Sequence, residues 1–266
     1  MKLSFSTVGC PDWDFGDILS IAKDIGYDGV EIRGIADQLD APEMELFSDS
    51  NIEKTKKRLA DTGIEIPVLC SNAALCINGG EAMAEAKSYI DLASRLGVPY
   101  VRVMPTLNPQ PEACDIESGI ALYRELCEYG AARKVVPLME TNGVLTDSAG
   151  MASFMKSVGH ENCGVLWDIH HPIRFINETP DKTVANIGQY VRHVHLKDSV
   201  VTGDRIEYKM PGHGDLPIAG CVKALEAAGY KGYYSFEWVK RWNPELTEPG
   251  VAFAHYIYYM RGLDNK

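Results

Sequence analysis

Residues 95–105, RLGVPYVRVMP, contain the unit that decides the fold: the end of a helix, a glycine, and an apolar strand that stops at a proline. Glycine is preferred where a helix ends, because it adopts the left-handed conformation without a steric penalty. The same order of helix, glycine and strand recurs in DIGYDG, DTGIEI and AAGYKG. These short connections indicate helices that alternate with parallel strands.

Eight such units cover the chain. Strands are predicted at residues 2–7, 29–34, 65–71, 100–105, 135–141, 163–169, 191–197 and 233–239. Helices are predicted at residues 14–25, 51–62, 81–96, 116–132, 148–157, 182–190, 218–228 and 249–262. Eight units favour a closed (β/α)8 TIM barrel, formed by a single domain over residues 1–266. An open doubly wound sheet would alternate in the same way, but no GxGxxG follows the first strand.

The connections that lead from strand to helix are longer than those that lead from helix to strand. They include residues 35–50, 105–115, 170–181 and 198–217 and contain most of the prolines. In a (β/α)8 barrel all of these loops lie on the C-terminal face, where the active sites of this fold are found. We therefore expect the functional residues at the C-terminal ends of the strands.

The composition excludes several classes of function. The formal net charge is −11 and no basic run offsets it, so we expect no nucleic-acid partner. No apolar stretch reaches the roughly 18 residues that span a bilayer, and the opening MKLSFSTVG lacks a basic segment followed by an apolar core, so we expect no secretory signal. The seven cysteines form no CxxC pair and are expected to be reduced core thiols. These features are typical of a cytoplasmic enzyme.

Four predicted strands in the second half of the chain end in a side chain that can bind a metal. They are Glu140 in VPLMETN, Asp168 in GVLWDIHHP, His195 in VRHVHLKD and Glu237 in YYSFEWV. Each interval is about one strand–helix unit, and the last contains the long 198–217 connection. A charged side chain in an apolar strand is costly to bury unless it is paired or binds a metal. The four positions therefore predict one shared site.

The residue types predict one divalent metal ion. Three carboxylates and an imidazole favour Mn²⁺, Co²⁺ or Mg²⁺ over a thiolate-rich zinc site, although Zn²⁺ also accepts such ligands. Any one carboxylate could instead pair with Arg33, Arg102 or Lys197. Four ligands on adjacent strand ends are better explained by a barrel active site.

The whole chain resembles the xylose isomerase-like barrel superfamily, in its sugar isomerase and epimerase branch. The resemblance rests on FSTVGCPDW, GYDGVEIRG, WDIHHP, HVHLKD and GHGDLPI. It implies Glu140, Asp168, His195 and Glu237 as metal ligands and His171 as a residue that contacts the substrate. It also implies a small carbohydrate as the substrate.

Two positions depart from the tagatose-type ketose 3-epimerases of this superfamily. Those enzymes usually have an arginine six residues after the metal-binding histidine and a second glutamate six residues after the first, whereas this chain has Val201 and Thr146. The HLKD string resembles instead ribulose-phosphate epimerases and inosose dehydratases, in which the lysine faces the substrate. The resemblance therefore implies that Lys197 contacts the substrate.

Further side chains are candidates for the substrate pocket. Glu31, at the end of the second strand, and Arg102, within the fourth, would bind the substrate or form ion pairs. Trp13, which follows the first strand, would line the pocket or belong to the core. His193 lies two residues before His195 on the same face of its strand, and we expect a buried, hydrogen-bonded side chain.

The two glutamates suggest the chemistry. Proton transfer next to a carbonyl needs a base poised near neutral pH and an electrophile, which a bound metal supplies. We predict that Glu140 or Glu237 removes a carbon-bound proton from a keto-sugar or sugar phosphate, and that the other returns one. The expected activity is an isomerase or epimerase of carbohydrate metabolism that acts through an enediolate.

Other functions remain open at this point. A lyase that dehydrates an inosose or keto-sugar would pass through the same enediolate. An endonuclease IV-like hydrolase needs histidines on early strands, whereas the first histidine is His160. A barrel that only binds a ligand leaves two metal-binding glutamates unexplained. A homo-oligomer could use the aromatic segment 255–260, although packing against the barrel explains that segment more simply.

Overall fold

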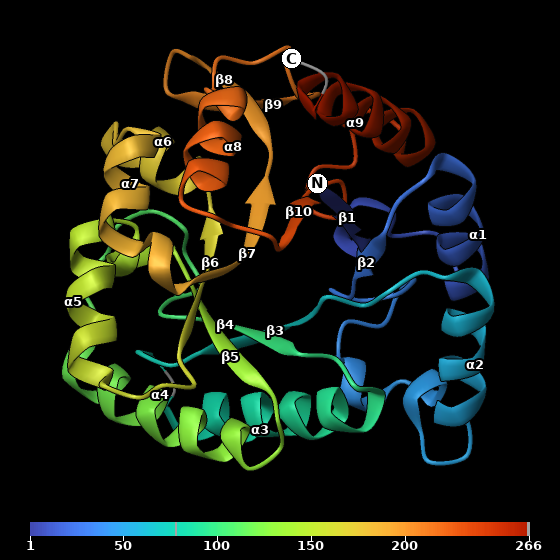
Figure 1. The fold of residues 1–266 in the computed structure, drawn as a ribbon, viewed down its shortest axis with the longest axis horizontal. Coiled ribbons are helices and arrows are strands. Elements are labelled where there is room, and N and C mark those ends of the chain that lie inside the picture. The colour runs from blue at the N-terminus through green and yellow to red at the C-terminus, as the bar shows by residue number, and fades with distance from the viewer. Residues whose placement is uncertain (78, 265–266) are drawn as a thin grey trace. The chain divides into compact units, whose positions relative to one another are not determined.

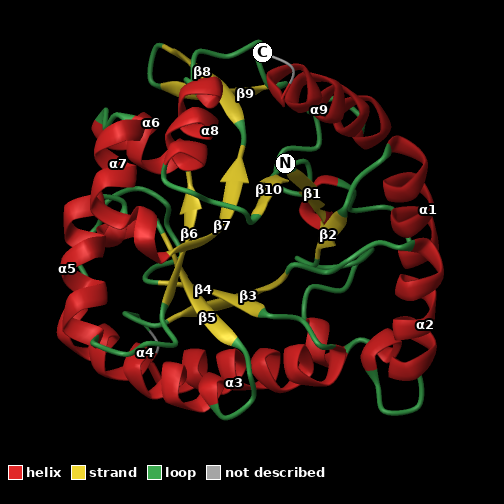
Figure 2. Cartoon of the chain, in the orientation of Figure 1, coloured by secondary structure: helices red, strands yellow, loops and turns green. Residues whose placement is uncertain are grey.

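The computed structural model describes residues 1–77 and 79–264, in which strands and helices alternate along the chain (Figures 1 and 2). The chain forms two compact units. The first contains residues 1–67, 195–219 and 231 onward, and the second contains residues 68–194 and 220–230. Residues 78, 265 and 266 lie outside the described part, and a single domain over residues 1–266 stays a prediction.

The elements agree closely with the predicted ranges. The strands are β1 (Lys2–Ser6), β2 (Gly29–Glu31), β3 (Val68–Ala74), β4 (Tyr100–Met104), β5 (Val136–Glu140), β6 (Gly164–Asp168), β7 (Val191–Leu196), β8 (Asp198–Thr202), β9 (Arg205–Lys209) and β10 (Tyr233–Phe236). The α-helices are α1 (Phe15–Ile25), α2 (Ile52–Thr62), α3 (Gly79–Leu96), α4 (Ile116–Ala131), α5 (Ser148–Val158), α6 (His170–Ile176), α7 (Pro180–Ile187), α8 (Ile218–Ala227) and α9 (Pro249–Asp264). Short 3-10 helices are η1 (Thr7–Gly9), η2 (Ala41–Glu43), η3 (Glu45–Phe47), η4 (Gly143–Leu145) and η5 (Gly188–Tyr190).

In the first unit the strand order is β2, β1, β10 and then the end of β7. Strand β1 pairs in parallel with both of its neighbours, and Phe5 lies opposite Phe236 of β10. The amide of Glu237 donates a hydrogen bond to the carbonyl of Leu196 over 3.0 Å, which joins the end of β10 to the end of β7. These pairings bring the carboxyl ends of β2, β7 and β10 to one edge.

Aromatic packing holds α9 on the strands of the first unit. The Phe253 ring stacks on Phe5 with a centroid distance of 4.1 Å, and the Tyr256 ring stacks on Phe236 at 4.8 Å. The Tyr256 hydroxyl donates to the carbonyl of Tyr234 over 3.0 Å. Packing therefore explains part of the aromatic segment 255–260, whereas Tyr258 in the same segment is 82% exposed.

In the second unit the strand order is β3, β4, β5, β6 and then the start of β7. All of the described pairs among β3 to β6 are parallel, and Glu140 of β5 lies opposite Leu166 of β6. Helix α3 packs on β3 and β4 (Figure 1). The buried Tyr123 of α4 donates from its hydroxyl to the carbonyl of Pro137 over 2.7 Å, which fixes α4 on β5.

Glycines end the helices where the sequence predicts. Gly26, Gly63, Gly97 and Gly229 all have positive φ, between 73° and 93°, and each ends a helix that leads into a strand or a short turn. A residue with a Cβ is strained in this conformation. The short connections from helix to strand are therefore confirmed.

Two connections that the sequence predicts as loops contain regular structure. Residues 170–176 form α6, and residues 198–209 form an antiparallel hairpin of β8 and β9. The hairpin turns at Gly203, which has a φ of 62°, and Asp204. A glycine–aspartate turn between two β-rich runs is a hairpin signal that a prediction of one long loop overlooks.

The candidate functional side chains lie at the carboxyl ends of strands in both units. Glu140 and Asp168 are the last residues of β5 and β6, and Glu31 is the last residue of β2. His195 is the penultimate residue of β7, and Glu237 directly follows β10. No helix in the described residues is long and apolar enough to cross a bilayer.

Candidate active site

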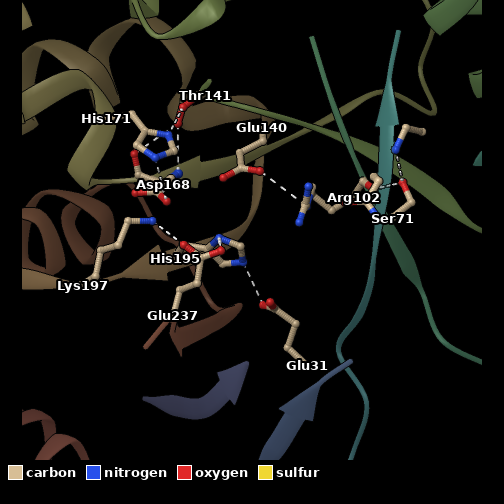
Figure 3. Close-up of polar contacts among 12 residues, drawn as sticks. Glu31, Ser71, Arg102, Glu140, Thr141, Asp168, His171, His195, Lys197 and Glu237 are labelled. Carbon is tan, nitrogen blue, oxygen red and sulfur yellow. Dashed lines mark hydrogen bonds and ion pairs between the residues drawn. The ribbon is translucent and has the colours of Figure 1, made fainter. Parts of the chain in front are cut away.

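The second unit contains a buried cluster of Glu140, Asp168 and His171 (Figure 3). One ligand atom from each of the three side chains lies within 4.8 Å of the others. His171 Nε2 is 3.5 Å from Asp168 Oδ2, and Arg102 Nε is 3.4 Å from Glu140 Oε2. Both distances are longer than those of strong hydrogen bonds, and the three ligand atoms lie close enough together to bind one metal ion.

The turn after β6 orients this cluster. Asp168 Oδ1 accepts a hydrogen bond from the amide of His170 over 2.9 Å, and the amide of Asp168 donates to Thr141 Oγ1 over 3.0 Å. His171 Nδ1 lies 2.8 Å from the carbonyl oxygen of Thr141. A carbonyl oxygen only accepts, so Nδ1 carries the hydrogen in this contact.

The tautomer of His171 has a consequence for cation binding. In the neutral ring, a hydrogen on Nδ1 leaves a lone pair on Nε2, and this atom faces Asp168 Oδ2. Two acceptors that face each other at 3.5 Å are stabilised by a proton or a cation between them. The two carboxylates therefore suit a divalent metal, and the imidazole beside them is placed to contact the metal or a substrate bound to it.

The first unit contains a chain of four polar side chains, Glu31, His195, Glu237 and Lys197 (Figure 3). His195 Nε2 is 2.8 Å from Glu31 Oε2, and His195 Nδ1 is 3.5 Å from Glu237 Oε1. Lys197 Nζ donates a hydrogen bond to the other oxygen of Glu237. Glu31 and His195 are fully buried and Lys197 is nearly so. Acidic and basic side chains thus alternate along this series of contacts.

The arrangement of His195 repeats that of His171. One ring nitrogen is held by an oxygen at 2.8 Å, and the other faces a carboxylate oxygen at 3.5 Å. When Nε2 donates to Glu31, the lone pair of Nδ1 points toward Glu237. A histidine that donates to a carboxylate with one nitrogen commonly binds a metal with the other.

Of the remaining predicted residues, Glu31 and Arg102 lie in their expected strands and Trp13 lies between β1 and α1, as expected. Glu31, predicted to bind substrate or to pair, contacts His195. Arg102 lies beside Glu140, and its carbonyl accepts from Ser71 Oγ over 2.7 Å. Trp13 is half-buried, with its ring edge-on to Phe253 at a centroid distance of 5.7 Å. This contact packs the Trp13 ring against α9 and leaves part of the side chain exposed.

The cysteines do not contribute nucleophiles to either group. All seven are free, and all but Cys114 are buried. Burial raises the pKa of the thiols of Cys10, Cys76, Cys114, Cys127, Cys163 and Cys221. A thiol with a raised pKa is a poor nucleophile and metal ligand near neutral pH. The candidate catalytic groups are therefore the carboxylates, imidazoles and cationic side chains.

Comparison with known proteins identifies the family. Residues 19–256 match the family described as Xylose isomerase-like TIM barrel. This chain belongs to that family. The resemblance seen in the sequence motifs is thereby confirmed. A comparison with curated proteins finds no significant match.

Solved structures similar to this family member cover nearly its whole length. The IOLI protein with a bound zinc atom is 18% identical, with a TM-score of 0.83, over 99% of this chain and 98% of that chain. The "probable 3-DHS dehydratase AsbF" from Bacillus anthracis is 16% identical, with a TM-score of 0.80, over 98% of this chain and 99% of that chain. D-psicose 3-epimerase from Clostridium cellulolyticum H10, solved with D-tagatose, is 18% identical, with a TM-score of 0.78, over 100% of this chain and 99% of that chain.

These likenesses show the fold. The chain is an α/β protein whose eight parallel strands curl as a barrel, as the eight predicted units indicate. The TM-scores of 0.78 to 0.83 hold over essentially complete chains, so the fold prediction is confirmed along the full length.

Proposed function

We propose that this protein is a divalent-metal-dependent isomerase or epimerase that acts on a keto-sugar or sugar phosphate by proton transfer. The observation that carries the proposal is the buried Glu140, Asp168 and His171 cluster, in a family whose name derives from a sugar isomerase. Buried carboxylates that face an imidazole lone pair are suited to a cation and to acid–base chemistry. A purely structural ion pair would need no such facing acceptors.

We further propose that Glu140, Asp168, His195 and Glu237 bind the metal, with Mn²⁺ or Co²⁺ as the expected ion. Each of these side chains lies at the carboxyl end of its strand, and each takes part in one of the two polar groups. When bound, the ion would polarise the substrate carbonyl and stabilise the negative charge of the enediolate. The oxygen-rich ligand set agrees with a hard divalent cation.

Two glutamates would move the protons. Glu237 has one oxygen near His195 and the other bonded to the Lys197 ammonium, which holds the carboxylate in a defined orientation. Glu140 lies in the other unit beside the Arg102 guanidinium. One carboxylate would accept the carbon-bound proton and the other would return it. Return to the opposite face gives epimerisation, and return to the neighbouring carbon gives isomerisation.

The substrate would be held by His171, Lys197, Arg102 and Trp13. His171 and Lys197 are buried, and each is already oriented by a hydrogen bond. Substrate hydroxyls are suitable partners for these groups, and a phosphate would find charge complementarity in Lys197. The D-psicose 3-epimerase named above, solved with D-tagatose, supports a small sugar. Val201 and Thr146 favour a substrate other than a free ketose of that type.

A dehydratase is the second candidate, because of the contact between Lys197 and Glu237. An ammonium group beside the catalytic carboxylate can protonate a leaving hydroxyl once the enediolate has formed. The similar AsbF structure, named as a probable dehydratase, supports the same alternative. Both candidates share the first proton abstraction and differ in the fate of the β-hydroxyl.

The test is an exchange screen in ²H₂O. Protein stripped with a chelator and reloaded with Mn²⁺ or Co²⁺ is incubated with keto-sugars, their phosphates and cyclic keto-polyols, and each product is measured by NMR and mass spectrometry. An epimerase or isomerase places solvent deuterium on carbon, whereas a dehydratase gives a product lighter by one water. Stripped protein should be inactive. Turnover without solvent deuterium at any carbon, or activity indifferent to metal, would contradict the proposal.

A further inference from the structure

The carboxylate of Asp198 has an environment that the proposed chemistry does not use. Asp198 is almost completely buried, and its two oxygens accept hydrogen bonds from four backbone amides. Oδ1 accepts from Ser199 at 2.9 Å and from Leu216 at 3.2 Å. Oδ2 accepts from Gly212 and from Gly214, both at 2.9 Å. One side chain thus ties both ends of the 198–216 segment together.

The sequence of the segment is adapted to this carboxylate. A Cβ at Gly214 would lie 2.0 Å from Asp198 Oδ1 and 2.6 Å from the carbonyl oxygen of Ser199, so only glycine fits there. Gly212 has a φ of 85°, which also favours glycine. The amide of Asp215 donates to the Ser199 carbonyl over 3.1 Å and adds a backbone bond across the same closure. The GHGDL stretch therefore forms a cradle for one acidic side chain.

Lys197 is the only residue between β7 and the hairpin. Strand β7 ends at Leu196 and β8 begins at Asp198, so the chain leaves the parallel sheet at Lys197. The backbone direction at this junction determines where the Lys197 side chain points. The backbone before Lys197 is held in β7, and the backbone after Lys197 is held by the four hydrogen bonds to the Asp198 carboxylate.

We propose that Asp198 is the positioning residue of Lys197: by closing the 198–216 segment at its base, it holds the Lys197 ammonium against Glu237. The inference deepens the proposed function, because it rests on Lys197 acting at the substrate. Asp198 itself touches neither substrate nor metal. An amide in its place cannot accept four bonds, because the NH₂ group would face backbone donors. The backbone after Lys197 would then lose the hydrogen bonds that hold it in place, and the Lys197 ammonium would lose its contact with Glu237.

The first experiment measures Lys197 directly and needs no substrate. Wild-type protein, Asp198→Asn and Gly214→Ala are treated with an amine-acylating reagent at one fixed pH, and acylation of each lysine is followed by mass spectrometry. In both variants Lys197 should react about tenfold faster or more, since a buried amine reacts only when its surroundings open. Lys54 and Lys223 should react at unchanged rates. The controls are Asp204→Asn, at the exposed hairpin tip, and Gly250→Ala, where an added Cβ meets no atom within 4 Å.

The second experiment is a double-mutant cycle on the exchange activity. If Asp198 acts through Lys197, the double variant Lys197→Met, Asp198→Asn should be no slower than Lys197→Met alone. Faster tryptic cleavage after Lys209 with unchanged Lys197 acylation would show that Asp198 only closes the loop, and would overturn the inference. So would additive losses in the cycle. Absence of any exchange activity would count against the proposed function, while the acylation result would still decide the role of Asp198.

Discussion

The two histidine groups, one in each unit, are built on the same plan with one difference. In the second unit the carbonyl oxygen of Thr141 holds His171 Nδ1 at 2.8 Å, and in the first unit the carboxylate of Glu31 holds His195 Nε2 at 2.8 Å. The second ring nitrogen faces a carboxylate at 3.5 Å in both. A neutral acceptor orients His171, whereas a charged acceptor orients His195 and makes it a better metal ligand.

The difference between the two acceptors indicates which histidine is suited to bind a metal and which is suited to contact a substrate. An imidazole that donates to a carboxylate becomes more electron-rich and binds a cation more tightly. An imidazole held by a neutral carbonyl lacks this added electron density and is well placed to exchange hydrogen bonds with a hydroxyl. The comparison therefore favours His195 as a metal ligand and His171 as a substrate contact. Three predictions test this assignment of roles.

The largest expected effect is on turnover. Glu237→Gln should lose about 10³-fold in turnover while it keeps the metal, because the amide fills the same space but accepts no proton. Metal content by mass spectrometry and turnover in the exchange assay would be measured together. Glu207→Gln is the matched control, since this glutamate is exposed on the hairpin and pairs with Lys209 and Thr202 of the same hairpin. Loss of metal in Glu237→Gln would contradict the division between binding and proton transfer.

The next effect compares the two histidines directly. His195→Asn should weaken Mn²⁺ binding about 100-fold or more, because an amide oxygen replaces a ligand strengthened by a carboxylate. His171→Asn should change Mn²⁺ binding only about threefold and should raise KM instead. Isothermal titration with Mn²⁺ measures the first quantity in both variants. Equal losses of affinity would make His171 a metal ligand and remove the distinction between the two groups.

The smallest effect concerns the anchor of His195. Glu31→Gln keeps an acceptor but removes the charge, and Glu31→Ala removes both, so Mn²⁺ affinity should fall in that order within a range of about 10- to 100-fold. The ¹⁵N shifts of His195 in metal-free protein should show a mixture of tautomers in Glu31→Ala. An unchanged affinity in both variants would mean that Glu31 binds the substrate, which is the role that the sequence also allows.

Much of the fold follows from the sequence because it depends on local physics. Helices end at Gly26, Gly63, Gly97 and Gly229, where the backbone adopts the left-handed conformation, and strands follow at once. The hairpin of β8 and β9 and the short α6 are harder to predict. Each lies in a long connection whose structure depends on distant contacts, and the turn at Gly203 is the one local signal that indicates the hairpin.

The sequence by itself determined the strand order along the chain and the chemistry at each strand end, since a period of apolar residues and a terminal carboxylate are local features. Only the tertiary structure decided the partners. Glu31 reaches His195 across 164 residues of sequence, and Asp198 gathers amides from a loop that ends at Leu216. Such contacts depend on the pairing of distant strands and the closing of a loop. The intervals between residues in the sequence do not reveal them, because a hydrogen bond depends on distances and angles in the folded protein.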